Sequence, residues 1–366
     1  MNEVKLPSYL KFTVILFGIT LFFYGLVQAK QVLVPLLISA YLAILLTPLS
    51  EFLENKLRFP KILGAIVSVS LIGAFIFATG YFFYSQLIGL VSDLPMVERR
   101  ITELFDRFKD VLPEDMTLET IDFTKESLIT FLRTNSKMIT TNAMAAVGNI
   151  TIAFIIPVYV VLMLYFRDFL YRFMIMALKN LKTPEDFKDL MDEIRNVVRN
   201  YIVGMFLVIC VLVILNSVAL FSLGIKHAFL FAVFAGILNI IPYLGPLIGS
   251  TVPILFALLT KDSLWYPVGV FACFYVIQLI ESNFLTPTIV GNRVSMNPLI
   301  TLLALFIGAY VWGLVGMILF IPSIAVLKVI FDRIEPLKPY GFLLGDARDR
   351  NDGYIRRRLS KFKRNA

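Results

Sequence analysis

The sequence predicts an all-α integral membrane protein with about eight hydrophobic segments, two of them broken helices or re-entrant hairpins, plus a small helical extracytoplasmic insert. Of its 366 residues, 58% are hydrophobic and only 16% are charged, whereas a soluble domain has roughly 45–50% and about 25%. The apolar residues gather in runs that are long enough to cross a bilayer, which takes about 20 residues. The runs lie near 9–29, 32–50, 62–88, 147–166, 201–225, 228–260, 264–284 and 299–331.

The spacing of these runs divides the chain into regions. The first run could be a signal peptide that ends at Ala29, but a second run begins at Val32, so we expect a first membrane span instead. Both cysteines, Cys210 and Cys273, lie inside apolar runs, which argues against a disulfide framework. We expect N-terminal spans over 1–90, the insert over 91–146, a fourth span and a cytoplasmic amphipathic helix over 147–200, a transport core with broken helices over 201–331, and a basic cytoplasmic tail over 332–366.

Two polar regions contain amphipathic segments. In the insert, "MVERRITELFDRFKDVL" places apolar residues, from Val97 and Ile101 to Val111, on one helical face. In the second, "TPEDFKDLMDEIRNVVRN", Thr183 and Pro184 are typical of a helix start. We expect this second helix to lie on the membrane surface and to continue into the fifth run.

Basic residues predict the orientation. Lys56, Arg58 and Lys61 crowd the short loop after the second run, and the 167–200 segment and the tail are also basic. The positive-inside rule therefore places both termini in the cytoplasm and the 91–146 insert outside. The tail has no acidic residue after Asp352, so we expect it to touch anionic membrane lipid. Nothing else in the sequence supports a nucleic-acid partner.

The run over 228–260 contains "ILNIIPYLGPLIGSTVP", in which proline and glycine stand where a plain membrane helix would have leucine. The run over 299–331 is interrupted in the same way. Each is too long for one upright span and too short for two, so each is either one broken, tilted span or a re-entrant hairpin. We expect eight proline and glycine residues to break these helices or to act as hinges, two of them in the segment that joins the two runs. They are Pro242, Gly245, Pro246, Gly249, Pro287, Gly291, Gly313 and Gly316.

Paired broken segments are the best sequence indication of a transporter's binding site, because they leave backbone groups free at membrane depth. Asn239, Tyr243, Ser250 and Thr251 would add polar side chains to the first segment. The alternative is a kinked helix that packs tightly through its glycines.

Between the two broken segments, Gln278, Glu281 and Ser282 share one helical face. Glu281 is the only acidic residue between Asp262 and Asp332, and an ionisable group at the end of an apolar span is costly unless it has a function or a partner. We expect Glu281 to bind a proton or a cation such as transported sodium. The alternative is an interfacial ion pair with Arg293. The substrate- or ion-binding residues expected here are Glu281, Asn239, Gln278, Asn283, Tyr243 and Asn292.

Two stretches carry a resemblance: "NIIPYLGPLIGSTVPILFAL" and "QLIESNFLTPTIVGNRVSMNPLITLLALFIGAYVWGLVGMILFIPSIAVLK". They resemble the C-terminal signature of the autoinducer-2 exporter family of prokaryotic membrane transporters. The positions that match the family's pattern are Asn239, Pro242, Gly245, Pro246, Glu281, Asn283, Pro287, Gly291, Asn292 and Pro298.

The resemblance implies a multi-pass protein of the prokaryotic plasma (inner) membrane that exports the signal furanone or exchanges sodium or lithium for protons. It also implies a homo-oligomer, such as a pentamer, with an elevator-like moving part. Independently of the resemblance, the residues indicate no ATP-hydrolysing loop, no cofactor and no resident metal site. The sole histidine, His227, is expected to be a solvated loop residue.

Two functions follow from these observations. The first is a secondary transporter in which Glu281 and the broken helices form the site. The second is a non-transporting membrane assembly or regulatory protein that docks through its insert and tail. A third function, that of an intramembrane enzyme, has little support, because one histidine and two buried thiols supply no nucleophile–base pair.

Overall fold

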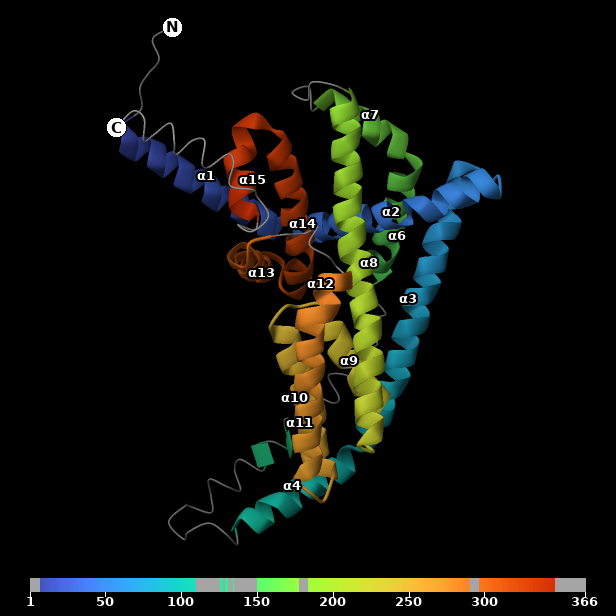
Figure 1. Cartoon of the computed structure of the whole chain (residues 1–366), viewed down its shortest axis with the longest axis vertical. Helices are drawn as coiled ribbons and strands as arrows, with labels where there is room; N and C mark the ends of the chain where they lie inside the picture. Colours follow the sequence, from blue (N-terminus) through green and yellow to red (C-terminus); the bar gives the residue numbers. More distant parts are fainter. Residues whose placement is uncertain are drawn as a thin grey trace. The chain divides into compact units, whose positions relative to one another are not determined.

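The computed structural model describes residues 7–109, 126–127, 129–130, 134, 150–177, 184–289 and 296–345. Helices dominate these ranges, and the one extended pairing within them is an isolated bridge between Met296 and Gly345, so the predicted all-α class is confirmed (Figure 1). The helices are α1 (Ser8–Gln28), α2 (Lys30–Lys56), α3 (Lys61–Ser92), α4 (Leu94–Lys109), α6 (Ile150–Tyr165), α7 (Arg167–Ala177), α8 (Pro184–Ser222), α9 (Ala228–Leu238), α10 (Leu244–Thr260), α11 (Trp265–Ile280), the π-helical turn η1 (Glu281–Leu285), α12 (Thr286–Ile289), α13 (Pro298–Trp312), α14 (Leu314–Arg333), the 3₁₀ turn η3 (Glu335–Leu337) and α15 (Lys338–Leu344).

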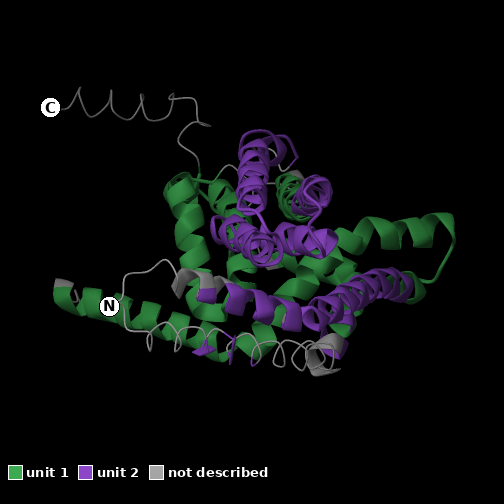
Figure 2. Cartoon of the chain, turned by 90° about the horizontal axis from the view of Figure 1, so that it is seen from below, with its two compact units in different colours: residues 1–65, 158–202, 292–366 green, residues 66–157, 203–291 purple. Residues whose placement is uncertain are grey.

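The chain forms two compact units, coloured separately in Figure 2. Unit 1 comprises residues 1–65, 158–202 and 292–366, and unit 2 comprises residues 66–157 and 203–291. The boundaries fall inside α3, α6 and α8, so these three helices contribute residues to both units. Each expected broken segment lies wholly within one unit: α9 and α10 in unit 2, α13 and α14 in unit 1.

Six helices in the described residues are long and apolar enough to cross a membrane: α1, α2, α3, α8, α11 with its continuation to Ile289, and α14. The fourth predicted run forms a shorter helix, α6, which meets α7 at a bend of 68°. Counted together, α6 and α7 give a seventh possible span. These lengths and compositions support a multi-pass membrane protein.

The 228–260 run folds as a helical hairpin rather than as one continuous helix. Helix α9 ends before Pro242, whose ring cannot donate the next helical hydrogen bond, and Tyr243 adopts a positive φ of 66°. The chain then turns back so closely that a Cβ atom at Gly245 would lie 2.0 Å from the carbonyl oxygen of Leu238. Further along, Gly249 packs against the backbone of Ala235, which brings α10 onto α9.

The 299–331 run forms the second hairpin, within unit 1. Gly313 breaks it with a φ of 67°, a conformation that glycine adopts without strain. Helices α13 and α14 then cross with backbone contact, because a Cβ atom at Gly308 would lie 2.5 Å from the carbonyl oxygen of Gly316. Helix α13 begins at Pro298, and the side chain of Asn297 caps it by accepting a hydrogen bond from the Leu299 amide (3.0 Å).

The helix near 183–200, which we expected on the membrane surface, instead packs its apolar face against other helices. It is the first part of α8, a continuous helix of 39 residues. Its apolar face is buried by protein, because Phe187, Leu190 and Val197 pack in unit 1 with Ala325 and Val329 of α14. An amphipathic pattern alone does not distinguish these settings, since a lipid surface and a protein partner both accept an apolar face.

The core of unit 2 includes the apolar face of the amphipathic helix α4. Val97 and Ile101 are buried with Phe231 of α9, Phe256 of α10 and Phe274 of α11. The expected helix in the insert is thus confirmed for its described part, and its last predicted core residue, Val111, lies outside the described residues.

Asp93, between α3 and α4, joins the start of α4 to the loop before α9. Its carboxylate accepts hydrogen bonds from Lys226 Nζ (2.7 Å to Oδ1) and lies 2.7 Å from His227 Nε2, whose side chain is largely buried. The expectation of a solvated histidine was therefore wrong. These two partners hold the pKa of the Asp93 carboxyl below its ordinary value.

We expect Asp93→Asn to lower the stability of the protein by about 1 kcal/mol at pH 7, because charge-assisted hydrogen bonds are lost. A carboxyl whose pKa is lower in the folded than in the unfolded state stabilises the fold above its unfolded pKa and loses this effect as the pH falls through its folded pKa. The difference between wild type and mutant should therefore shrink below about pH 4. Thermal unfolding in detergent across pH measures it, with the exposed Asp192→Asn as the control.

Candidate functional site

The site begins where α11 changes its winding. After Ile280 the chain forms a π-helical turn, Glu281–Leu285, in which the Thr286 amide donates to the Glu281 carbonyl five residues earlier. Pro287 follows directly and has no amide hydrogen to continue the α-helical pattern. Side chains bond the carbonyls near this turn: Asn283 Nδ2 donates to Leu279 O (2.8 Å). Such turns occur often at functional sites.

Glu281 is buried at this turn, with 8% of its surface exposed. Its Oε2 accepts hydrogen bonds from Gln278 Nε2 (2.8 Å) and Ser282 Oγ (3.1 Å). Its Oε1 accepts from the hydroxyl of Thr286 and from Asn239 Nδ2 (3.5 Å). Four neutral side chains from two separate segments therefore converge on one carboxylate.

The four side chains hold the Glu281 carboxylate by hydrogen bonds and supply no positive charge. No basic side chain among the described residues forms an ion pair with Glu281, and Arg293, the partner considered from the sequence, lies outside them. Removing a carboxylate from water costs several kcal/mol, and hydrogen bonds to a charged group return roughly 1.5–3 kcal/mol each. The same side chains also carry oxygens: two hydroxyls, two amide carbonyls and the carboxylate. Oxygen atoms are the ligands that hard cations prefer.

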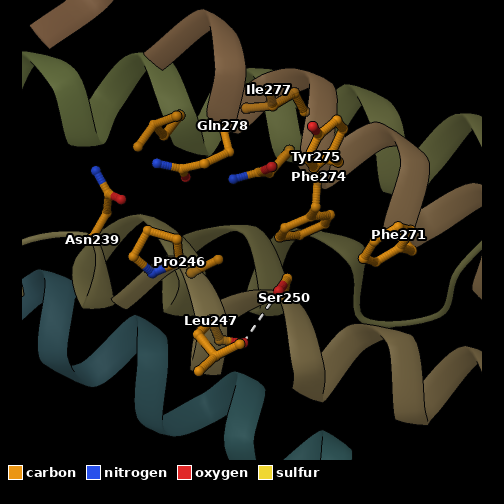
Figure 3. Close-up of a pocket in the computed structure, with 12 residues that line it drawn as sticks. Asn239, Pro246, Leu247, Ser250, Phe271, Phe274, Tyr275, Ile277 and Gln278 are labelled. Carbon is orange, nitrogen blue, oxygen red and sulfur yellow. Dashed lines mark hydrogen bonds between the residues drawn. The ribbon is translucent and has the colours of Figure 1, made fainter. Parts of the chain in front are cut away.

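A pocket of about 240 Å³ adjoins these groups within unit 2. Its wall comes from α8, from Asn239 after α9, from α10 and from α11. Figure 3 shows the amides of Asn239 and Gln278 facing each other, with Pro246 of α10 below them, Phe274 on the same helix as Gln278, and Ser250 further along α10. Asn239 and Gln278 thus touch both the pocket and Glu281.

The structure brings together three of the residues expected from the sequence: Asn239, Gln278 and Glu281. Asn283 instead bonds the backbone of its own helix, and Tyr243 is 67% exposed at the hairpin turn. Asn292 and Gly291 lie outside the described residues. Of the expected hinge residues, Pro242, Gly245, Pro246 and Gly249 form the hairpin that positions Asn239, Pro287 follows the π-helical turn, and Gly313 and Gly316 shape the separate hairpin of unit 1.

Three polar residues of this region were not among the expected binding residues. Ser282 and Thr286 bond Glu281, and Asn216 of α8 lines the pocket. Asn216 and its neighbour Ser217 interrupt an otherwise apolar part of the fifth run, which is the signal that could have identified them. Among the residues that the structure describes, no cluster of three or more His, Cys, Asp or Glu could hold a metal ion.

Comparison with known proteins places the chain in a family. The model of the AI-2E family transporters matches residues 12–335. Two Bacillus subtilis (strain 168) relatives, YrrI and YueF, each named "Putative transport protein", are 27% and 29% identical to the chain; the alignments cover 82% and 83% of this chain and 86% and 84% of theirs. The Escherichia coli (strain K12) AI-2 transport protein TqsA is 22% identical over 92% of this chain and 96% of its own. Because the family model covers most of the sequence, the chain belongs to the AI-2E family of transporters.

Proposed function

We propose that this membrane transporter is a secondary transporter in which Glu281 binds a proton or a monovalent cation, and that this binding is coupled to movement of cargo. The observation that carries the proposal is the buried Glu281 carboxylate, which four neutral donors hold beside a pocket that Asn239 and Gln278 also line. A carboxylate in this setting gains most from a positive ion, because its hydrogen-bond partners leave its charge uncompensated.

The cargo has two candidates. One is sodium or lithium, exchanged for protons. The other is a small polar solute of the autoinducer-2 type, and the name of TqsA supports it. In either case, a proton and a cation that occupy the same carboxylate compete, so a single residue could couple two fluxes.

The proposal includes the membrane location, the orientation and the oligomeric state of the protein. The basic loops and tail favour an inner-membrane protein with both termini in the cytoplasm. The family resemblance favours a homo-oligomer, such as a pentamer, in which part of each chain moves in an elevator-like manner. The mass of the purified complex in detergent tests the oligomer.

Transport by the purified protein in liposomes tests the function. Internal pH is followed while sodium or lithium is added outside, at several values of external pH. Competition at one carboxylate predicts that the apparent affinity for the cation weakens as the external pH is lowered, by up to tenfold for each pH unit. A cation affinity that does not change with pH would refute competition at Glu281. No flux of either cation or of a furanone solute, with folded and inserted protein, would favour the non-transporting assembly protein.

A further inference from the structure

We propose that the pocket of unit 2 binds a small, neutral, hydroxyl-rich solute, and that Asn216 of α8 is one of its recognition residues. The proposal rests on the proposed function, because it assigns the cargo site that adjoins the ion-binding carboxylate. The residues that carry it are Asn216, Asn239, Ser250, Phe274 and Gln278.

The size and charge of the pocket restrict its occupant. Its volume of about 240 Å³ is below the roughly 300–1,000 Å³ that is usual for drug-sized ligands, so the occupant is small. None of the residues that line it is charged. An anionic solute would therefore lose its hydration without gaining a counter-charge from the wall, and it would lie near the Glu281 carboxylate, which favours a neutral solute over an anion.

Asn216 is the residue that most needs a partner. It is 3% exposed and lines the pocket. Its side-chain oxygen has no hydrogen-bond partner in the described part of the chain. A buried amide oxygen without a partner destabilises a fold, and such a cost is typical of a site that is shaped for a ligand rather than for stability.

The other polar groups of the pocket define which hydrogen-bond donors and acceptors the solute must carry. Asn239 and Gln278 use their NH₂ groups to bond Glu281, so their carbonyl oxygens remain as acceptors. The Ser250 hydroxyl donates to the carbonyl of Leu247 and keeps its own lone pairs (3.2 Å; Figure 3). The amide of Asn216 supplies both a donor and an acceptor. Hydroxyl groups satisfy all of these, because each hydroxyl donates one hydrogen bond and accepts others.

The remaining wall is apolar and aromatic. Phe274 is buried in the unit 2 core beside the pocket, and Phe271 and Tyr275 lie along the same helix (Figure 3). Such faces suit the C–H surface of a polyhydroxylated solute, while the amides fix its orientation. Since Asn239 and Gln278 belong to both sites, the solute and the ion would bind next to each other.

The chain supplies a matched control for Asn216 in its neighbour. Ser217 is also buried, at 8% exposed, and its hydroxyl likewise has no partner among the described residues, but it does not line the pocket. Asn216→Leu keeps a similar shape and removes the amide, and Ser217→Ala removes the hydroxyl. Both variants should fold, because each removes an unpartnered polar group rather than a contact.

The experiment measures binding of radiolabelled ribitol, a neutral five-carbon polyol, to the purified full-length protein in detergent. We expect saturable binding by wild type and by Ser217→Ala, at least tenfold weaker binding by Asn216→Leu, and no competition by ribitol 5-phosphate, its charged counterpart. A melting temperature for Asn216→Leu that equals or exceeds that of wild type would show that the loss is not caused by misfolding.

Three results would overturn the inference: no saturable binding of ribitol by wild type, equal losses in both variants, or equal binding of the phosphate. Glu281→Gln, measured for ion-dependent proton uptake in the same preparations, separates this inference from the proposed function. Loss of ribitol binding in Asn216→Leu together with normal proton uptake in Glu281→Gln would support the pocket and refute the ion site. The reverse pair of results would refute the pocket alone.

Discussion

Replacing Glu281 with glutamine is expected to reduce cation-driven proton movement in liposomes to the rate of protein-free liposomes. Glutamine keeps the size of the side chain but cannot take up or release a proton. The NH₂ group of the glutamine would replace one of the two carboxylate oxygens. It would then face the two donors that now bond that oxygen: either Gln278 and Ser282, or Asn239 and Thr286. The variant therefore loses both the charge and the hydrogen-bond pattern that hold an ion.

The matched control is Glu335→Gln in the η3 turn of unit 1, where the glutamate side chain is 80% exposed and forms an ion pair with Lys338. This variant should transport like wild type, since an exposed ion pair contributes little. Normal cation-driven proton movement by Glu281→Gln would contradict the assignment of the carboxylate. An equal loss in both variants would show that the assay reports a general effect of removing negative charge.

We expect Gly245→Ala to destabilise the α9–α10 hairpin by about 2–4 kcal/mol, which is large against the usual effect of a single substitution. A methyl group at Gly245 would lie 2.0 Å from the carbonyl oxygen of Leu238 and 2.8 Å from the Cα atom of Asn239. Both of these are backbone atoms, so the turn itself must open. Asn239 would move with it, and the variant should also lose its contact with Glu281.

Thermal unfolding in detergent, together with the yield of monodisperse protein, measures this effect. The control is Gly73→Ala in α3, where nothing lies within 4 Å of the added methyl group. That variant should be as stable as wild type or more stable by up to about 1 kcal/mol, because alanine is the better helix former. Similar melting temperatures for the two variants would contradict the close turn at Gly245.

Much of the site follows from the sequence because two local rules determine it. Proline and glycine break the helix at Pro242 and Gly245, and the spacing of Gln278 and Glu281 puts both on one helical face. The proximity of Asn239 to Glu281 was expected only because the first broken segment and the polar end of the next helix were assigned to one binding site. The π-helical turn, which brings Thr286 to the carboxylate, depends on a change of winding that periodicity does not predict.

The remaining differences arise from packing between segments that are distant in sequence. Phe187 and Leu190 form an apolar face that suits a membrane surface as well as α14, and only the tertiary structure decides between them. His227 follows a basic residue in a short loop, as an exposed residue would, yet Asp93, more than a hundred residues earlier, binds it. Asn216 was not predicted as a binding residue, because a single amide in an apolar helix indicates a site only once the structure shows a pocket beside it.

The central claim is that Glu281 exchanges a proton for a cation. The most direct test adds sodium or lithium chloride to the purified protein in weakly buffered detergent solution and measures the protons released, with choline chloride as the control salt. In a series of starting pH values, the account predicts a release by wild type that saturates at no more than one proton per chain, and no release by Glu281→Gln at any of them. The same release from both proteins would contradict it.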